Sequence, residues 1–558
     1  MGNKKYLNYS GMIDDNRKRA YVPPVSILWT SDGEKSPVDP EILVGCHEIQ
    51  PYIHFNPAVC VLKSGSGILL DYGRELHGGI RLVTGSPRGE KRPAVRIRFG
   101  ESASEAMQEP NNDHANHDSI IDLPAMGATE FGMTGFRFVR LDVPETQSGE
   151  LELIAVPAVA LYRDLEYAGS FRCSDERLNR IWETGAYTVH LNMQDYIYDG
   201  IKRDRLVWMG DMHPEIKVIS AVFSDNALVE KSLDFLRDRI PLSKSMNGIS
   251  SYSCWWVICH FDWFMARGDF DYLRTQKAYL SGVLREMLSW VDEAGVERMP
   301  AWRFLDWPSA GNDTALHAGL QGLLSWALGC GETLSGILGD REMAALCGDA
   351  RRRMSRHVPG CAGNKAAAAM QVLGGIGDAE SINRNVLAAD PLSGLSTFYG
   401  YYMLQAKALC GDISGSLDVI RRYWGGMLDF GATTFWEDFD LDWIKNASRI
   451  DELPQPGKDD LHADFGAHCY KGLRHSLCHG WAGGPTAWLS EHILGIKSLA
   501  PGMSRIKIIP HLADLDWVEG TFPAAGSVIH CRVEKRNDGT LKLDYDVPAG
   551  VEVVTPES

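Results

Sequence analysis

The stretch Ser174-Asp175-Glu176-Arg177-Leu178-Asn179-Arg180-Ile181-Trp182 marks the point where the pattern of the chain changes. Its serine can cap a helix, and the two acidic residues that follow favour the positive end of the helix dipole. Apolar residues then recur on one helical face, at Leu178, Ile181, Trp182 and Val189. The stretch therefore predicts the first amphipathic helix of a helical region.

Helical spacing continues from this stretch to about residue 498. It recurs between Leu280 and Val291, between Leu316 and Leu338, and between Leu395 and Leu409. The region is too long for a four-helix bundle, and it shows no clear repeat at the periods typical of helical solenoids. A closed ring of paired helices fits its length better.

Both flanks of the helical region are patterned as β-structure. Upstream, Val95-Arg96-Ile97-Arg98-Phe99 and Phe136-Arg137-Phe138-Val139-Arg140-Leu141 alternate apolar and charged residues with the period of a half-buried strand. Downstream, Arg505 to Pro510 and Val528 to Val533 read as strands, and Asn537-Asp538-Gly539 reads as a hairpin turn. We therefore predict three domains: an N-terminal antiparallel β-sandwich at 1–165, a helical domain at 166–498 and a small C-terminal β-sandwich region at 499–558.

The bulk composition is that of a globular protein without a basic footprint. The chain has 558 residues, with 56 Lys plus Arg against 73 Asp plus Glu, a net charge of −17, and 44% hydrophobic residues. This charge argues against nucleic acid or an anionic membrane as a partner.

No apolar run approaches the roughly 18 residues of a membrane helix, and the first residues lack the apolar core of a signal peptide. We expect a cytoplasmic location for the chain as written, or a periplasmic or secreted one if a leader has been removed; the oligomeric state stays open.

The cysteine, histidine and tryptophan patterns narrow the kind of site. The 12 cysteines contain no CxxC pair, so we interpret them as mostly reduced, buried residues. His114 and His117 lie three positions apart without a further clustered ligand, which indicates a polar loop rather than a zinc site. Of the 16 tryptophans, only Trp29 and Trp517 lie outside the stretch from Trp182 to Trp488. Tryptophan is costly to place unless it packs or stacks, so we expect the tryptophans of the helical region to pack in its core or to stack on a ligand.

The densest polar cluster is Asp199-Gly200-Ile201-Lys202-Arg203-Asp204-Arg205-Leu206-Val207-Trp208-Met209-Gly210-Asp211, with three acids, three bases and a tryptophan in 13 positions. If the segment enters a helix, Asp204, Trp208 and Asp211 share one face. One interpretation is a solvated helix start held by salt bridges. The other is a carboxylate among positive charges beside a tryptophan that stacks on a sugar, which suits glycoside hydrolysis.

The second cluster, Gly431 to Asp440, follows the helical run that ends near Leu428. Its Gly-Ala-Thr-Thr stretch is too small and too β-prone to continue a helix, so Trp436 and Glu437 are predicted on a loop between helices. An ordinary acidic loop would show the same pattern. Asp204 and Glu437 are 233 residues apart, and a closed ring of helices would bring them together.

The third cluster, Arg474 to Pro485, contains small residues that permit close backbone approach. His479 and Trp481 can line a pocket there, although a lone histidine is more often a packing residue. Other candidates in the helical region carry an aromatic or acidic side chain: Trp255, Trp256, Asp306 and Trp307. Together these segments predict an aromatic-lined cavity with several acids.

The domain order and the three clusters resemble the α-L-rhamnosidases of glycoside hydrolase family 78. The resemblance runs from about residue 65 to 535 and is most specific at Arg203-Asp204-Arg205-x-x-Trp208-x-Gly210-Asp211 and Gly431-Ala432-Thr433-Thr434-x-Trp436-Glu437. Leu70 to Leu76 and Phe99 to Ser102 are similar to the family's N-terminal sandwich signature. The resemblance implies an (α/α)6-barrel catalytic domain flanked by N-terminal (jelly-roll-like) and C-terminal antiparallel β-sandwich domains. It also implies hydrolysis of terminal α-L-rhamnosyl groups with inversion.

The family's motifs assign roles to positions of this sequence. The positions that match its first site are Asp199, Arg203, Trp208 and Asp211. Asp204 stands where the family usually has its general-acid Glu, and it is one methylene shorter. Glu437 matches the general base, and His479 matches a sugar-binding histidine, although Gly-Trp follows where Tyr-Ala is usual. The chain thus resembles a divergent branch of the family.

The resemblance implies an inverting hydrolase with Asp204 as general acid and Glu437 as general base. The remaining candidates are expected to contact the sugar: Asp199, Arg203, Trp208, Asp211, Trp255, Trp256, Asp306, Trp307, Trp436, His479 and Trp481. This chemistry needs neither a metal nor a cofactor, and the expected partner is a rhamnose-containing carbohydrate. Two alternatives stay open: a glycosidase on the same fold for another α-linked sugar, and a catalytically inactive carbohydrate-binding relative.

Overall fold

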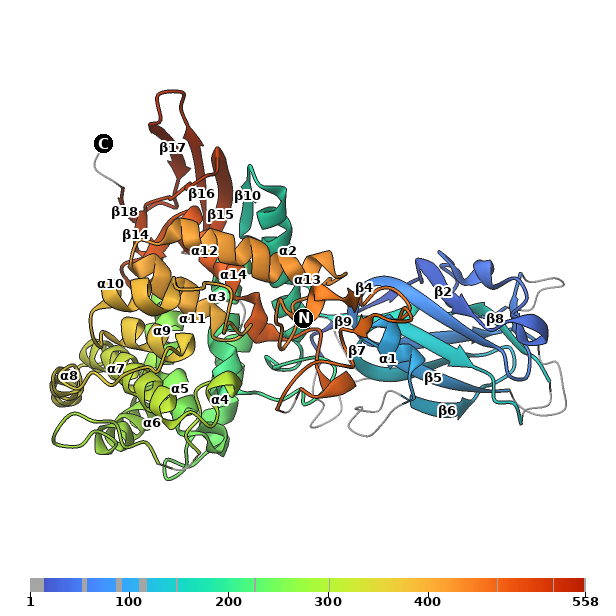
Figure 1. Cartoon of the computed structure of the whole chain (residues 1–558), viewed down its shortest axis with the longest axis horizontal. Helices are drawn as coiled ribbons and strands as arrows, with labels where there is room; N and C mark the ends of the chain where they lie inside the picture. Colours follow the sequence, from blue (N-terminus) through green and yellow to red (C-terminus); the bar gives the residue numbers. More distant parts are fainter. Residues whose placement is uncertain are drawn as a thin grey trace, which may run out of the picture.

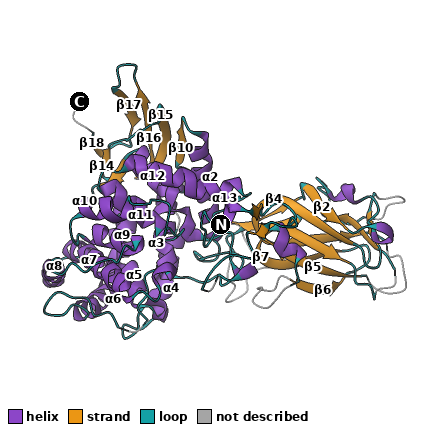
Figure 2. Cartoon of the chain, viewed as in Figure 1, coloured by secondary structure: helices purple, strands orange, loops and turns teal. Residues whose placement is uncertain are grey.

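The computed structural model describes residues 15–52, 58–86, 93–109, 118–146, 149–224, 227–300, 302–468, 470–524 and 526–555. Figure 1 shows two bodies side by side: a β-rich N-terminal body, and a helical body that carries a smaller β-structure near the C-terminus. Figure 2 separates them in the same way, by strands in the first body and helices in the second. His114 and His117, interpreted above as part of a polar loop, lie outside the described residues.

The N-terminal body is built on a nine-stranded antiparallel sheet. Its strands are β1 (Lys18–Val22), β2 (Ser26–Thr30), β3 (Cys60–Leu62), β4 (Gly67–Thr84), β5 (Ala94–Gly100), β6 (Asp118–Asp122), β7 (Ala128–Asp142), β8 (Leu151–Ala155) and β9 (Ala158–Tyr162). Six strands follow the order β1-β9-β4-β7-β5-β6, while β2, β3 and β8 pair off this path. The two alternating stretches predicted as strands lie in β5 and β7, and Val95 and Ile97 face the apolar core. A short helix, α1 (Ala103–Met107), follows β5.

The second body contains the remaining helices. They are α2 (Glu176–Asn192), α3 (Met209–Val222), α4 (Leu228–Arg239), α5 (Ser250–Arg267), α6 (Phe270–Ser289), α7 (Asp313–Ile337), α8 (Arg341–Met354), α9 (Lys365–Gly374), α10 (Ala379–Ile382), α11 (Gly400–Leu409), α12 (Ile413–Val419), α13 (Gly425–Asp429) and α14 (Gly484–Trp488). Short π-helical turns continue three of them, at Asn383–Leu387, Ile420–Trp424 and Leu489–Ile493.

Six of these helices contact one another in a closed series. The contacts run from α3 through α5, α7 and α9 to α11, and α14 contacts both α11 and α3. In the sequence they alternate with helices outside this series: α2, α4, α6, α8, α10 and α12. A continuous cluster of buried apolar side chains runs through the body. The helical region is therefore a ring of helix pairs, as its length and spacing indicated.

The helix predicted at Ser174 begins with a different cap. Asp175 caps α2, because its Oδ1 accepts from the backbone N–H groups of Arg177 at 2.8 Å and Leu178 at 3.4 Å. Ser174 Oγ instead accepts from the backbone N–H of Asp516 at 3.0 Å. The prediction of a serine cap is therefore wrong. The carboxylate stands one position nearer to the free N–H groups of the first turn, while the serine ties the helix start to the C-terminal region.

Two small sheets form the C-terminal β-structure. One has the order β10 (Ser170–Cys173), β15 (Trp517–Ala524), β16 (Ser527–Lys535) and β17 (Leu541–Asp546), and the other joins β13 (Ile496–Ser498), β14 (Arg505–Ile508) and β18 (Glu552–Val554). A two-stranded pair, β11 (Ala447–Ser448) and β12 (Asp459–Asp460), lies in a loop. The predicted turn at Asn537-Asp538-Gly539 does connect two antiparallel strands, β16 and β17. However, β10 and β13 both come from the span predicted as helical, because each completes a sheet with a later strand.

None of the described helices combines the length and the apolar character needed to cross a bilayer. The described cysteines are free thiols. All of them except Cys46, Cys361 and Cys410 are buried, which agrees with their interpretation as small apolar residues.

Candidate active site

Three loops that are far apart in the sequence meet beside the helical ring. Gly200 pairs with His479 in an isolated β-bridge, and the backbone N–H of Glu437 donates to the carbonyl of Ser476 at 2.9 Å. The backbone N–H of His479 donates to the carbonyl of Phe435 at 3.0 Å. The three polar clusters singled out in the sequence are therefore neighbours in space.

These loops border a cavity of about 170 Å³. Its lining includes most of the residues named from the sequence: Asp199, Arg203, Asp204, Trp208, Asp211, Trp307, Glu437, His479 and Trp481. Further lining residues that the sequence analysis missed are Ile249, Tyr252, Trp302, Phe304 and Arg474. Asp211 and Tyr252 lie in the first turns of α3 and α5, so the N-terminal ends of inner helices point their positive dipole ends at this cavity.

The first cluster is a loop as far as Trp208, and only its last three residues, Met209 to Asp211, enter a helix. α3 begins only after Trp208, and Asp204 and Arg205 adopt left-handed backbone conformations with φ of 55° and 52°. Such conformations are uncommon for residues other than glycine and concentrate at functional sites. The expectation that Asp204, Trp208 and Asp211 share a helical face is therefore wrong. They line one cavity because the loop folds over the first turn of α3.

Glu437 is buried, and one of its carboxylate oxygens is held from two sides. Oε2 accepts from Arg203 Nη2 at 2.5 Å and from the backbone N–H of Ser476 at 3.1 Å. The other oxygen, Oε1, lies 3.8 Å from His479 Nδ1. Charge-assisted bonds of this kind orient a carboxylate strongly. Glu437 therefore presents Oε1 on the side of His479.

The guanidinium of Arg203 contacts both carboxylates predicted as catalytic. Its Nη2 is 2.5 Å from Glu437 Oε2, its Nη1 is 3.2 Å from Asp204 Oδ2, and its Nε donates to the carbonyl of Arg474 at 2.7 Å. Because one planar guanidinium makes both contacts, the two carboxylate oxygens are no more than about 8 Å apart. The Asp204 side chain is 35% exposed, whereas that of Glu437 is 4% exposed.

Two buried carboxylates and an imidazole lie deeper in the site. His479 Nε2 is 3.0 Å from Asp211 Oδ1, and Asp199 Oδ1 accepts from the backbone N–H of Leu206 at 2.9 Å. Burial raises the pKa of Asp199 and of Asp211 above the usual range. Burial alone would lower the pKa of His479, but the carboxylates of Glu437 and Asp211 outweigh it and raise that pKa. This favours a cationic imidazole that donates hydrogen bonds.

Aromatic side chains form one wall of the cavity. The ring of Phe304 lies 5.9 Å from that of Trp302 and 5.0 Å from that of Trp307. Trp307 also stacks on His468 at 5.5 Å. Trp302 and Phe304 come from the segment that contains Trp307, so the aromatic density of that segment was the signal that would have found them.

Two further tryptophans hold the surrounding loops. Trp481 Nε1 donates to the backbone carbonyl of Glu437 at 3.0 Å, and its ring stacks on Phe398 with the centroids 4.6 Å apart. The ring of Trp208 meets Tyr252 edge-on at 6.2 Å. These contacts leave each tryptophan part of the cavity wall while fixing its orientation.

Four residues named from the sequence do not line the cavity: Trp255, Trp256, Asp306 and Trp436. Trp255 stacks on Tyr402 at 4.8 Å, and Trp436 lies edge-on to Phe439 at 5.5 Å. Asp306 accepts from Ser396 Oγ at 2.6 Å, and burial raises its pKa to about 7. A closed ring has to fill its own centre, and residue type alone does not distinguish such filling from a cavity wall.

One cluster of described residues has the composition of a cation site. Glu101, Glu105 and His462 bring their ligand atoms within 4.8 Å of one another. The ammonium of Lys202 lies 3.1 Å from each of the two carboxylates. The chain itself therefore supplies the positive charge at this cluster, and we assign no metal to it.

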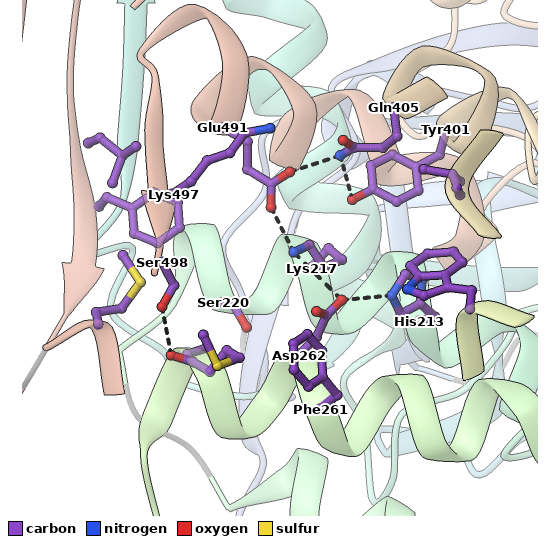
Figure 3. A pocket seen from close by; sticks show the side chains of 17 residues that line it. His213, Lys217, Ser220, Phe261, Asp262, Tyr401, Gln405, Glu491, Lys497 and Ser498 are labelled. Carbon is purple, nitrogen blue, oxygen red and sulfur yellow. Dashed lines mark hydrogen bonds and ion pairs between the residues drawn. The ribbon is translucent and has the colours of Figure 1, made fainter. Parts of the chain in front are cut away.

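A second cavity, of about 290 Å³, lies between the inner helices α3, α5 and α11 and the strands β13 and β15. In Figure 3, Lys217 lies between the carboxylates of Glu491, at 2.7 Å, and Asp262, at 3.7 Å, and Asp262 also contacts His213 at 2.9 Å. These charged groups pair with one another, and none of the residues named from the sequence lines this cavity. The catalytic candidates all belong to the first cavity.

The closed series of helices thus carries two carboxylates on one aromatic-walled cavity. Residues 166–320 match the family model described as the bacterial alpha-L-rhamnosidase 6 hairpin glycosidase domain. No curated protein sequence matches the chain. This family match covers 155 of the 558 residues and supports the resemblance stated from the sequence: the matched region is similar to a rhamnosidase glycosidase domain.

Solved structures of rhamnosidases share the fold. A GH78 family rhamnosidase of Bacillus sp. GL1 superimposes with a TM-score of 0.73 at 23% identity, over 93% of this chain and 56% of that one. The rhamnosidase of Klebsiella oxytoca with rhamnose bound gives 0.68 at 20% identity, over 85% and 96%. The α-L-rhamnosidase of Streptomyces avermitilis complexed with L-rhamnose gives 0.70 at 18% identity, over 88% and 48%. The chain therefore spans only about half the length of the Bacillus and Streptomyces proteins.

Proposed function

We propose that the protein is an inverting glycoside hydrolase that removes terminal α-L-rhamnosyl groups from oligosaccharides, polysaccharides or glycosides. The observation that carries the proposal is the contact of one guanidinium, Arg203, with both Asp204 and Glu437 at the edge of one cavity. The helical ring is then an (α/α)6 barrel at about 166–498, between β-sandwich domains. A rhamnose-containing carbohydrate is its partner.

Glu437 is the general base in this proposal. Its Oε2 is occupied by Arg203 and Ser476, so Oε1 is the oxygen available to take a proton from water. Inverting enzymes place their carboxyls roughly 6.5–9.5 Å apart to admit that water. The limit of about 8 Å between the contacting oxygens of Asp204 and Glu437 admits this spacing and also the roughly 5–5.5 Å of retaining enzymes, so the anomer of the product has to decide between them.

Asp204 is the general acid. It donates its proton to the glycosidic oxygen as the bond to the anomeric carbon breaks, while the water delivered by Glu437 attacks from the opposite face. The exposed 35% of its side chain suits a leaving group that departs towards solvent.

The rest of the cavity suits a single sugar ring. Its volume of about 170 Å³ is smaller than the roughly 300–1,000 Å³ of sites for drug-sized ligands. Asp199, Asp211 and His479 offer acceptors and a donor to ring hydroxyls. Trp208 and Trp307 offer apolar faces to the C–H surface and the methyl group of a deoxy sugar.

The two alternatives make different demands on these residues. Another α-linked sugar would keep the carboxylate pair and change only the contacts around the ring. A carbohydrate-binding relative without activity would need no general base, and so no buried carboxylate at this position of the cavity. The presence of Glu437 beside Asp204 therefore favours an enzyme.

Kinetics of Asp204→Asn and Glu437→Gln test the roles of the two carboxylates. On a rhamnosyl disaccharide, we expect each variant to lower kcat by about 10²–10⁴-fold. On p-nitrophenyl α-L-rhamnoside, Asp204→Asn should lose much less, because nitrophenolate leaves without a proton, while Glu437→Gln should lose as much. Asp440→Asn, in an exposed part of the Glu437 loop, serves as the matched control.

Three outcomes would count against this proposal. Activity that survives both substitutions would refute the residue assignment. Turnover of other glycosides without turnover of rhamnosides would refute the substrate. Proton NMR that shows a first-formed sugar with the anomeric configuration of the substrate would refute inversion.

A further inference from the structure

Two carboxylates of the N-terminal β-body contact the loops that border the first cavity. Glu101 follows β5 directly and Glu105 lies in α1, and both side chains are fully buried. Glu105 Oε2 accepts from the backbone N–H of Glu101 at 2.8 Å, which fixes the two side chains relative to each other. Neither residue lines the cavity. Their position still places them against the loops that do.

Lys202 connects these carboxylates to the loop of the first polar cluster, between Asp199 and Trp208. Its Nζ lies 3.1 Å from Glu101 Oε2 and 3.1 Å from Glu105 Oε1, and it donates to the carbonyls of Leu473 and His475 at 2.7 Å each. The Lys202 side chain is 2% exposed. A buried ammonium needs such partners, because an unpaired charge in the interior is strongly unfavourable. Glu101 and Glu105 thus hold Lys202, the residue next to Arg203.

Glu101 also accepts hydrogen bonds from the third polar cluster, Arg474 to Pro485. The backbone N–H of Leu477 donates to Glu101 Oε2 at 2.6 Å, and Ser476 Oγ donates to Glu101 Oε1 at 3.5 Å. The backbone N–H of the same Ser476 donates to Glu437 Oε2. The two donors that orient Glu437, from Arg203 and Ser476, therefore both lie on segments anchored by the β-body.

We propose that Glu101 and Glu105 are positioning residues that set the orientation of the general base through Lys202, Arg203 and Ser476. This inference rests on the proposed function, because it assigns a purpose to the orientation of Glu437. It makes the N-terminal β-body a working part of the active site and not an accessory domain. Misplacement of a catalytic group by about 1 Å can cost about 10²-fold in rate, so a remote anchor has kinetic consequences.

The kinetic test compares variants of Glu101 with a matched buried carboxylate. We expect Glu101→Ala to lower kcat by about 10²-fold while KM changes little, because the substrate contacts remain. Glu101→Gln keeps an acceptor oxygen for Leu477 and should recover part of the loss. Glu152→Gln, a change at a 5% exposed carboxylate of β8 in the same sheet, should leave kcat unchanged. Equal kcat in Glu101→Ala and Glu152→Gln, or an effect on KM alone, would overturn the proposal.

A second readout does not depend on activity. The titration midpoint of His479 can be followed by NMR and assigned with His479→Asn. The Glu437 carboxylate raises the pKa of His479. If Glu101→Ala displaces that carboxylate, the titration midpoint of His479 should fall, whereas Glu152→Gln should leave the midpoint unchanged. A shifted midpoint in a protein that hydrolyses no glycoside would refute the proposed function and leave the positioning role standing. An unchanged midpoint would refute the positioning role, and Glu101→Gln carries the same test if Glu101→Ala does not fold.

Discussion

Trp302 has a large aromatic side chain that borders the cavity and is still 51% exposed. Under the proposed function a terminal sugar fills the small cavity, so the next part of the substrate would lie at its edge. An exposed indole beside a concave site suits such a contact, because aromatic faces pack well on sugar rings and other flat groups. At the scale of single residues, we therefore expect Trp302 to contact the leaving group of the proposed substrate.

We expect Trp302→Ala to raise KM for a rhamnosyl disaccharide about tenfold, which corresponds to about 1.4 kcal/mol of lost contact, with little change in kcat. Tyr52→Ala, which removes another half-exposed aromatic ring far along the chain from the cavity residues, is the control and should leave KM unchanged. An unchanged KM in Trp302→Ala would show that the leaving group lies elsewhere.

At the scale of elements, buried ion pairs join the C-terminal halves of the inner helices. Lys217 in α3 pairs with Glu491 in the turn Leu489–Ile493 at 2.7 Å, and Asp262 in α5 lies 3.7 Å from the same ammonium. Burial alone would raise the pKa of Glu491, but the ammonium groups of Lys217 and Lys497 outweigh it and lower that pKa to about 2. The folded state therefore stabilises the ionised form of Glu491 relative to the unfolded chain.

The pKa of Glu491 predicts a defined loss of stability in acid. The folded pKa of about 2 lies below the ordinary 4.5, so this contribution is complete above about pH 4.5 and is lost as the pH falls towards 2. We expect wild type to lose on the order of 3 kcal/mol more unfolding free energy than Glu491→Gln over that range, measured by urea titration at each pH. Glu342→Gln, at an exposed carboxylate of α8, should behave as wild type. Parallel acid profiles for wild type and Glu491→Gln would contradict the prediction.

At the scale of the whole molecule, the C-terminal β-structure is continuous with the helical ring. β15 pairs with β10, which directly precedes α2, and β14 pairs with β13 after the last inner helix. Val518, Phe522 and Ile529 belong to the same buried apolar cluster as the ring. The small C-terminal sheets therefore close the hydrophobic core of the helices and do not fold apart from it.

Deleting residues 499–558 should expose the edge of β10 and the apolar surface that β15 and β16 cover. We expect the shortened protein to lose cooperative thermal unfolding or to aggregate, as followed by circular dichroism and light scattering. Deleting only residues 547–558 removes β18 and should cost far less stability. A cooperative, soluble product of the longer deletion would show that the ring folds independently.

Much of the fold and most of the cavity could be predicted from the sequence. Helical spacing after Ser174 and strand alternation on either side indicated a ring between β-regions, because periodicity records which face of an element is buried. The three clusters that were singled out, around Asp204, Glu437 and His479, line one cavity. The serine cap was wrong because Ser174 bonds to Asp516, which is distant in the sequence, and the supposed helix of the first cluster was wrong because Asp204 and Arg205 adopt left-handed conformations that spacing does not indicate.

By itself the sequence indicated a helical region between β-regions and three polar clusters, because residue spacing and motif composition are local properties. Only the tertiary structure decided which tryptophans line the cavity and which fill the ring, because burial on a closed surface depends on every neighbouring helix. It also decided that Glu437 is held by Arg203 and Ser476, and that Glu101 of the β-body contacts Lys202, next to Arg203, and Leu477, next to Ser476. These partners are between 39 and 376 positions apart in the sequence, so only the folded chain brings them together.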